Sequence, residues 1–143
     1  MRKTKAFTLI EILVVATIIG LLTAAAFISY AQLSRQSRDA KRKADLEQIR
    51  AAVEMYRSNN ASNAYPSFTL SCSSTGGISE GTTTYLSSIP KDPKCSTNTY
   101  YYSTSGTDYT LGAFLEASSS TCSSTYSCGG VNCNYCLGPY GQK

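Results

Sequence analysis

The sequence predicts an α+β protein in which a long N-terminal helix, half suited to a membrane and half amphipathic, packs on a small antiparallel β-sheet. Three observations predict this fold class. Residues 12–34 contain no charged side chain, residues 35–58 contain neither Gly nor Pro, and three later segments are rich in residues that favour strands. All six cysteines lie beyond residue 71. We therefore expect a helical N-terminal part and a cysteine-rich β head.

The first half of the helix is long enough to cross a membrane. Residues 12–34, ILVVATIIGLLTAAAFISYAQLS, would extend about 34 Å as a helix, and a bilayer core is about 30 Å thick. We expect this segment to be part of one helix over residues 7–58. Glu11 lies at the start of the apolar run. A carboxylate in hydrocarbon costs roughly 2.5 to 3.5 kcal/mol, so Glu11 is a candidate functional residue.

The second half of the helix, residues 34–58, carries an apolar stripe. Its large apolar side chains recur at spacings of three, four and three: Leu46, Ile49, Val53 and Tyr56. Such a stripe favours packing on a sheet. On the polar side, Asp39 precedes Lys43 by four residues and Arg50 precedes Glu54 by four, so each is expected to form an ion pair along the helix.

Three segments of the head predict strands, and STSGTD predicts a hairpin turn between the last two. The segments are TTTYLSSI at 82–89, TNTYYYST at 97–104 and DYTLGAFLE at 108–116. One face of the last segment should cover the helix stripe, through Tyr109, Leu111, Ala113 and Leu115. The connector that follows the helix and the C-terminal tail predict no strand. A sheet of three or four strands is expected.

The six cysteines are disulfide candidates: Cys72, Cys95, Cys122, Cys128, Cys133 and Cys136. An even number in a small domain indicates bridges in an oxidising compartment, with fifteen possible pairings. The spacing CNYC at 133–136 also allows a redox motif, or a zinc site made with the two preceding cysteines. A redox motif needs a helix after its first cysteine, whereas GGVNCNYCLGPYG predicts a loop. Zinc ribbons use two such knuckles and the chain has one, so we expect no metal or cofactor.

Several function classes are excluded or disfavoured by composition. The chain contains no His, which excludes a Ser-His-Asp or Cys-His nucleophile and a His metal ligand. Residues 59–143 hold three Lys/Arg against four acids, so no nucleic-acid site is evident. We also expect that the protein is not an enzyme.

The basic leader MRKTKA followed by AFTLIEILVVATIIGLL resembles the processing site of type IV pilins and of the related pseudopilins of type II secretion. The resemblance implies that a prepilin peptidase cuts between Ala6 and Phe7 and methylates the new amino terminus. It also implies that Glu11 pairs with the amino terminus of a neighbouring subunit during assembly. The family normally has Gly before the cut, where this chain has Ala6.

The resemblance implies a ladle-like pilin fold with four parts: leader 1–6, transmembrane and assembly helix 7–33, amphipathic helix half 34–58 and Cys-rich head 59–143. A row of small residues would let helices pack closely in a filament core: Ala16, Gly20 and Ala24. Among the possible pairings we favour Cys72 with Cys95. The last four cysteines would then cross-link the tail, as a C-terminal disulfide loop does in many pilins. We leave open whether a calcium ion binds near the sheet, where Asp92, Asp108 and Glu116 would supply oxygen ligands.

The sequence therefore predicts a structural subunit of a type IV pilus-like filament, serving adhesion, motility or DNA uptake. One alternative is a pseudopilin of type II secretion. Another is an unprocessed, membrane-anchored binding or redox domain. The implied partners are other copies or other pilins, the prepilin peptidase, and an assembly platform with its ATPase. We expect a single-pass protein of the cytoplasmic membrane with its head outside, and later an extracellular filament. The positive-inside rule alone opposes this orientation, because residues 35–43 hold five Lys/Arg and the leader three.

Overall fold

The computed structural model describes residues 7–117, 122 and 126–143. The chain divides into two compact units, Met1–Arg35 and Gln36–Lys143. Its single long helix, α1, spans Leu9–Asn59, close to the range expected from the sequence. The α+β class with a long N-terminal helix and small antiparallel sheets is thus confirmed.

Helix α1 ends in a tight polar turn. The N–H of Asn60 donates to the carbonyl of Tyr56, and the side-chain oxygen of Asn60 accepts the N–H of Ser62 at 2.9 Å. Asn63 then has a φ of 51°, in the left-handed region that Asn tolerates better than most residues. Asn59 and Asn60 stand at this point, and Asn side chains favour helix ends because they compete for backbone hydrogen bonds.

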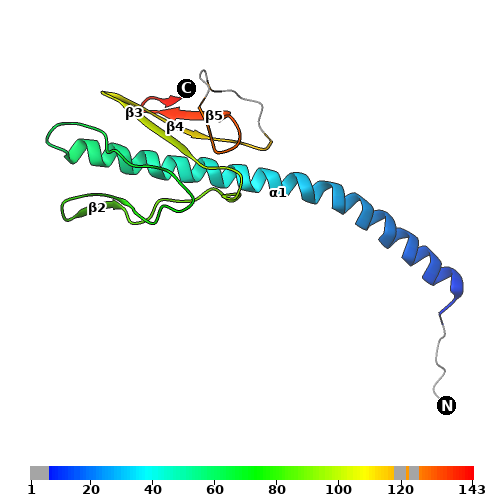
Figure 1. Ribbon diagram of the computed structural model, residues 1–143. Coiled ribbons are helices and arrows are strands. Elements are labelled where there is room, and N and C mark those ends of the chain that lie inside the picture. The colour runs from blue at the N-terminus through cyan, green and yellow to red at the C-terminus, as the bar shows by residue number, and fades with distance from the viewer. Residues whose placement is uncertain (1–6, 118–121, 123–125) are drawn as a thin grey trace, which may run out of the picture. The chain divides into compact units, whose positions relative to one another are not determined.

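The strands of the second unit form two separate antiparallel sheets. The smaller sheet pairs β1 (Ile78–Glu80) with β2 (Thr83–Leu86). The larger has the order β3-β4-β5-β6, with bounds Tyr101–Ser105, Asp108–Ala113, Tyr135–Gly138 and Gly141–Gln142. Figure 1 shows the part of α1 in this unit with β2 on one side and β3, β4 and β5 on the other.

Two features of this arrangement correct the sequence analysis. Strand β1 lies in the connector expected to have no strand, and it takes β2 away from the main sheet. Strand β5 begins at Tyr135, inside the segment expected to be a loop. Both segments were misjudged because short strands flanked by Gly and Ser show little periodicity of their own. Their pairing partners supply the hydrogen bonds that make them strands.

The core of the second unit lies on the apolar stripe of α1. Leu46, Ile49 and Val53 are each fully buried, and the same cluster contains Leu111 and Ala113 of β4. The expectation that alternate residues of this strand cover the stripe is confirmed for Tyr109, Leu111 and Ala113, whereas Leu115 is buried outside this cluster. Alternation places these side chains on one face of the sheet, so a helix with a matching stripe can seal it.

The hairpin from β3 to β4 sets the register of the main sheet. Ser105 pairs with Asp108, and Gly106 between them has a φ of 60°, as a two-residue turn requires. Further along, Tyr101 faces Gly112. A side chain at Gly112 would meet the sulfur of Cys133 at 2.9 Å, so the glycine permits a close approach of the C-terminal tail.

Candidate functional site

The N-terminus of α1 is closed by reciprocal hydrogen bonds between Thr8 and Glu11. The Thr8 N–H donates to Oε2 of Glu11 at 2.9 Å, and the Thr8 hydroxyl donates to the same oxygen at 2.8 Å. In return the Glu11 N–H lies 3.4 Å from Oγ1 of Thr8. This is a capping box, which satisfies N–H groups that the first turn leaves unpaired. Within the single chain, the carboxylate singled out by the sequence therefore bonds to Thr8.

The capping box was readable in the sequence and was overlooked. Thr8-Leu9-Ile10-Glu11 has a threonine followed three residues later by a glutamate, directly before an apolar run. The box gives Glu11 a second physical role beside its charge, because it fixes where the helix begins. Thr8 supplies hydrogen bonds but no positive charge, so a cation brought to the carboxylate would still be strongly attracted.

The apolar part of α1 is exposed along its length. The helix contains an 18-residue stretch of mean hydropathy 2.5, none of it buried inside the protein, which is long and apolar enough to cross a membrane. Its hydroxyl side chains donate to their own helix, Thr17 to the carbonyl of Val14 and Thr23 to that of Ile19. Polar groups satisfied in this way suit a lipid environment, where no water replaces a missing bond.

Small residues lie at four-residue intervals on this surface. Ala16, Gly20 and Ala24 are exposed, and a helix places such residues on one face. A side chain added at Gly20 would meet nothing within 4 Å. The use of this face for helix packing remains a prediction. Phe7 is 81% exposed, whereas Ala6 and the rest of the leader lie outside the described residues.

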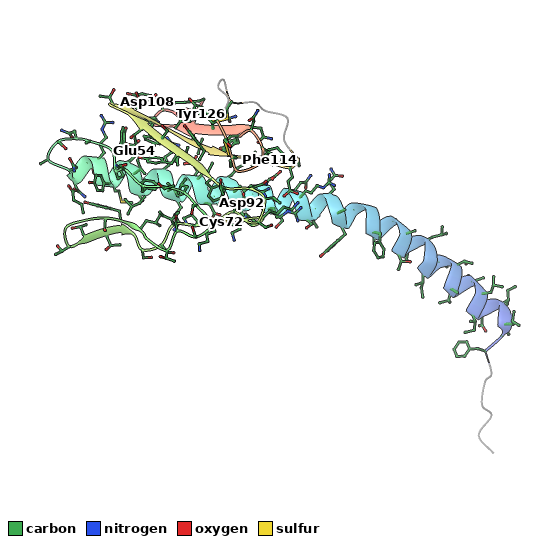
Figure 2. The ribbon with its side chains drawn as sticks, in the orientation of Figure 1. Glu54, Cys72, Asp92, Asp108, Phe114 and Tyr126 are labelled. Carbon is green, nitrogen blue, oxygen red and sulfur yellow. A yellow bond between two sulfur atoms is a disulfide. The ribbon has the colours of Figure 1, made fainter. Side chains whose placement is uncertain are left out.

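The second unit contains a buried ion cluster centred on Arg42, which is completely inaccessible to solvent. Figure 2 labels one of its members, Asp92. Its guanidinium donates to both oxygens of Asp92, at 2.7 and 3.1 Å. It also donates to Asp39 and to Glu116, each at 2.9 Å. Arg38 adds a bidentate pair with Glu116, at 2.8 and 2.7 Å. The cluster therefore joins α1 to the segment before β3, through Asp92, and to the segment after β4, through Glu116.

The charges and hydrogen bonds of the cluster are balanced. Lys94 adds a third cation, bonded to Glu116 at 2.8 Å, against the three carboxylates. Hydrogen bonds from Arg38 hold the pKa of Glu116 far below its ordinary value, against the opposing effect of burial. Burial lowers the pKa of Arg42, but its hydrogen bonds to Asp92 and Glu116 outweigh this effect and raise the pKa overall.

The ion cluster corrects the expected pairing along α1. Asp39 is buried and bonds to Arg42 and to the N–H groups that follow β4, rather than to Lys43. Likewise Arg50 pairs with Glu47 at 3.2 Å instead of with Glu54, which accepts the hydroxyl of Tyr109 at 2.9 Å. The i, i+4 rule describes isolated helices. Here Asp39 and Arg50 each find a partner three positions away, and the tertiary bonds to Asp39 and Glu54 compete with the expected pairs.

The sequence contains one weak signal for this cluster. Arg42 and Asp39 lie on the same side of the helix as the apolar stripe, where a charge must find a partner. Its partners could not be identified, because Asp92 lies 50 and Glu116 74 positions away.

Comparison with known proteins concerns the N-terminal segment. Residues 1–27 match the family model of the prokaryotic N-terminal methylation motif. This match supports a type IV pilin-like prepilin. No curated protein and no solved structure gave a match. The motif marks a processed, pilin-like subunit that is methylated and membrane-associated, and it points to a structural role rather than to an enzyme.

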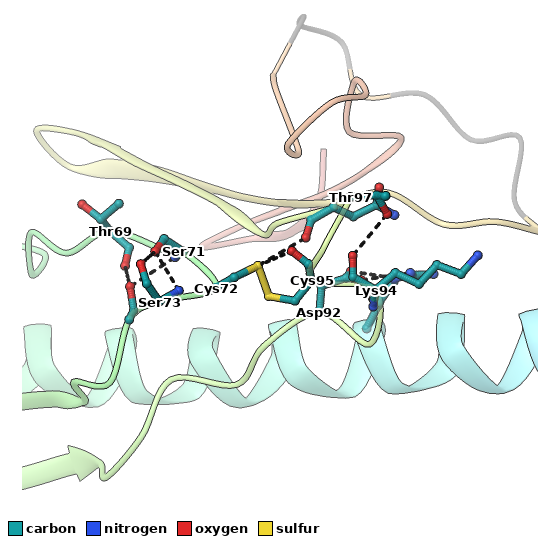
Figure 3. Close-up of a disulfide and its surroundings, with 11 residues drawn as sticks. Thr69, Ser71, Cys72, Ser73, Asp92, Lys94, Cys95 and Thr97 are labelled. Atoms are coloured by element: carbon teal, nitrogen blue, oxygen red, sulfur yellow. Dashed lines mark hydrogen bonds and ion pairs between the residues drawn. A yellow bond between two sulfur atoms is a disulfide. The ribbon is translucent and has the colours of Figure 1, made fainter.

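All six cysteines of the prepilin are bridged. The pairs are Cys72–Cys95, Cys122–Cys136 and Cys128–Cys133. The first is the pair favoured from the sequence. Figure 3 shows it beside Asp92 and Lys94, so it anchors the segment that supplies two members of the ion cluster. The expectation of disulfides is confirmed, and the cysteines of CNYC bond to other cysteines, not to each other.

The acids of the prepilin considered for calcium are bonded to cations of the protein itself. Asp92 and Glu116 belong to the ion cluster, and Asp108 pairs with Lys143 at 2.7 Å. Within the described part of the chain, no three potential metal ligands gather at one place. Guanidinium and ammonium groups thus balance these carboxylates.

Proposed function

We propose that the chain is a structural subunit of a type IV pilus-like filament, cut between Ala6 and Phe7 and polymerised through the first part of α1. The observation that carries the proposal is the methylation motif on a helix whose apolar side chains find no cover in their own protein. Such a surface needs lipid before assembly and other subunits afterwards. The small-residue row at Ala16, Gly20 and Ala24 would let those helices approach closely.

Processing would supply the positively charged partner that Glu11 lacks within its own chain. Cutting after Ala6 removes the cations of the leader and creates an ammonium at Phe7. The Thr8 N–H and the Thr8 hydroxyl both donate to Oε2 of Glu11, so Oε1 is the oxygen that a neighbouring ammonium could reach without breaking the cap. Opposite charges attract strongly in surroundings of low dielectric constant, so this pair would favour a defined register between subunits.

The partners follow from this pathway. A prepilin peptidase would process the chain at the cytoplasmic face, and an assembly platform with its ATPase would extract it from the membrane. We propose that the head lies outside the cytoplasm, because its three disulfides need an oxidising compartment. Three bridges in so small a head favour a filament exposed outside the cell, with roles in adhesion, motility or DNA uptake. A pseudopilin of type II secretion is the alternative.

The test combines mass spectrometry with filament yield. The membrane-extracted protein should begin at methylated Phe7, whereas an intact Met1 would support an unprocessed anchor. Glu11→Gln should leave the head folded and lower the yield of sheared filaments at least tenfold. The matched control is Glu47→Gln, an exposed acid on α1 that should leave the yield unchanged. Undiminished filaments from the Glu11 variant would contradict the assigned role.

The two filament types can be separated in the same strain. A pilus subunit should appear in the fraction sheared from the cell surface. Its deletion should leave the set of secreted proteins unchanged. Loss of secreted proteins without any sheared filament would favour the pseudopilin.

A further inference from the structure

All eight acidic side chains of the unit Gln36–Lys143 are bonded within their own chain. Five have cationic partners: Asp39, Glu47, Asp92, Asp108 and Glu116. Three accept hydrogen bonds from the neutral side chains of Tyr100, Tyr109 and Asn60: Asp45, Glu54 and Glu80. This unit therefore has no unbonded carboxylate side chain with which to bind a cationic partner.

The cations of this unit differ from its acids, because some of them have no carboxylate partner among the described residues. Three exposed lysines have no carboxylate within ion-pair distance among the described residues, and we call them the basic collar: Lys41, Lys43 and Lys91. Only Lys43 makes a further contact, with its ammonium 5.4 Å from the centre of the Tyr135 ring. The basic collar is thus an uncompensated positive surface.

Each lysine of the basic collar is a sequence neighbour of a member of the ion cluster. Lys41 and Lys43 flank Arg42 on α1, so the helix directs them to its two sides. Lys91 directly precedes Asp92, the residue that Arg42 holds. Because Arg42 and Asp92 are buried and bonded to each other, the backbone that carries all three lysines is fixed. In the sequence, Lys41 lies seven residues beyond Ser34, where the apolar run ends.

We propose that the basic collar binds anionic phospholipid head groups of the membrane that holds the apolar part of α1. The proposal rests on the membrane anchoring described under the proposed function. Lysine side chains are long enough to reach phosphate groups at a membrane surface, and each contributes about a fivefold factor in affinity there. The collar would hold the head against the membrane until assembly removes the subunit from lipid.

A second copy of the chain fits the basic collar less well. An ion pair with a neighbouring head would need a free carboxylate side chain, and each of the eight is already bonded inside its own head. Breaking such a bond would cost part of what the new pair gains. A lipid phosphate carries its charge at no such cost, which is why we favour lipid over protein as the occupant.

The test uses the full chain in vesicles of phosphatidylcholine that contain a small fraction of spin-labelled phosphatidylglycerol or spin-labelled phosphatidylcholine. Electron spin resonance gives the association of each lipid with the protein, and their ratio measures the selectivity for anionic lipid. The variant is K41Q/K43Q. The matched control, R57Q/K143Q, removes the same charge elsewhere in the head. The leader cations are the same in all three proteins, so their contribution cancels.

We expect K41Q/K43Q to lower the selectivity for phosphatidylglycerol at least fivefold, with little change in the control. The selectivity of the wild-type protein should also fall as salt is raised, because ionic screening weakens contacts at an exposed surface. Equal selectivity in the wild-type protein and K41Q/K43Q would overturn the proposal, and so would an equal loss in the control. Processing at Phe7 and filament yield are measured separately, so failure of this proposal leaves the filament subunit standing.

Discussion

The ion cluster allows a sharp test of how the head is held to α1, through the substitution Arg42→Met. Methionine keeps most of the length of the side chain and removes its charge. Four hydrogen bonds of the guanidinium would disappear, two of them to Asp92. Glu116 would keep Arg38 and Lys94. Asp92, whose side chain is only 1% exposed, would keep among the described residues the hydrogen bond that the Lys94 N–H donates to it at 2.7 Å.

The expected loss in the free energy of unfolding is about 3 to 5 kcal/mol, the usual result of leaving a buried charge without its partner. That is a large share of the roughly 5 to 15 kcal/mol by which a domain is stable. The control Lys41→Met changes the neighbouring exposed lysine, and its effect should stay within about 0.5 kcal/mol.

Urea unfolding of the full chain in detergent, followed by near-ultraviolet circular dichroism of the head tyrosines, measures both variants. Asp92→Asn and the double variant Arg42→Met with Asp92→Asn complete a cycle. Since removing both partners leaves fewer orphaned charges, the double variant should lose at least about 1 kcal/mol less than the sum of the singles. Strict additivity, or an Arg42 variant as stable as the Lys41 control, would refute the assigned role of the cluster.

Two further outcomes follow from the head. Arg38 lowers the pKa of Glu116 below its ordinary value of 4.5, so the stability that this carboxylate contributes is present above about pH 4.5 and is lost as the pH falls further. Measuring the free energy of unfolding across this acid range should show the loss, and its absence would contradict the pairing. Gly112→Ala should lower the free energy of unfolding by about 1 to 3 kcal/mol, because the new methyl would lie 2.9 Å from the sulfur of Cys133. The control Gly76→Ala meets nothing within 4 Å, and an equal effect of both substitutions would exclude crowding as the cause.

The elements that the sequence predicted well are those with a long, regular pattern. The apolar run and the stripe of Leu46, Ile49 and Val53 span many turns, so their period identifies the helix and its buried face. The hairpin at Gly106 was equally clear, because few residues other than glycine suit its turn. Strands β1, β5 and β6 have two to four residues each, too few for a period to be recognised.

The sequence by itself determined the N-terminal chemistry of this protein. The leader, the cap formed by Thr8 and Glu11, and the apolar run are contiguous, so their order along the chain already defines the processing motif. Only the tertiary structure decided which distant carboxylates Arg42 meets, because Asp92 lies 50 and Glu116 74 positions away. A buried charge must be paired, but which distant acid pairs with it depends on how the intervening chain folds.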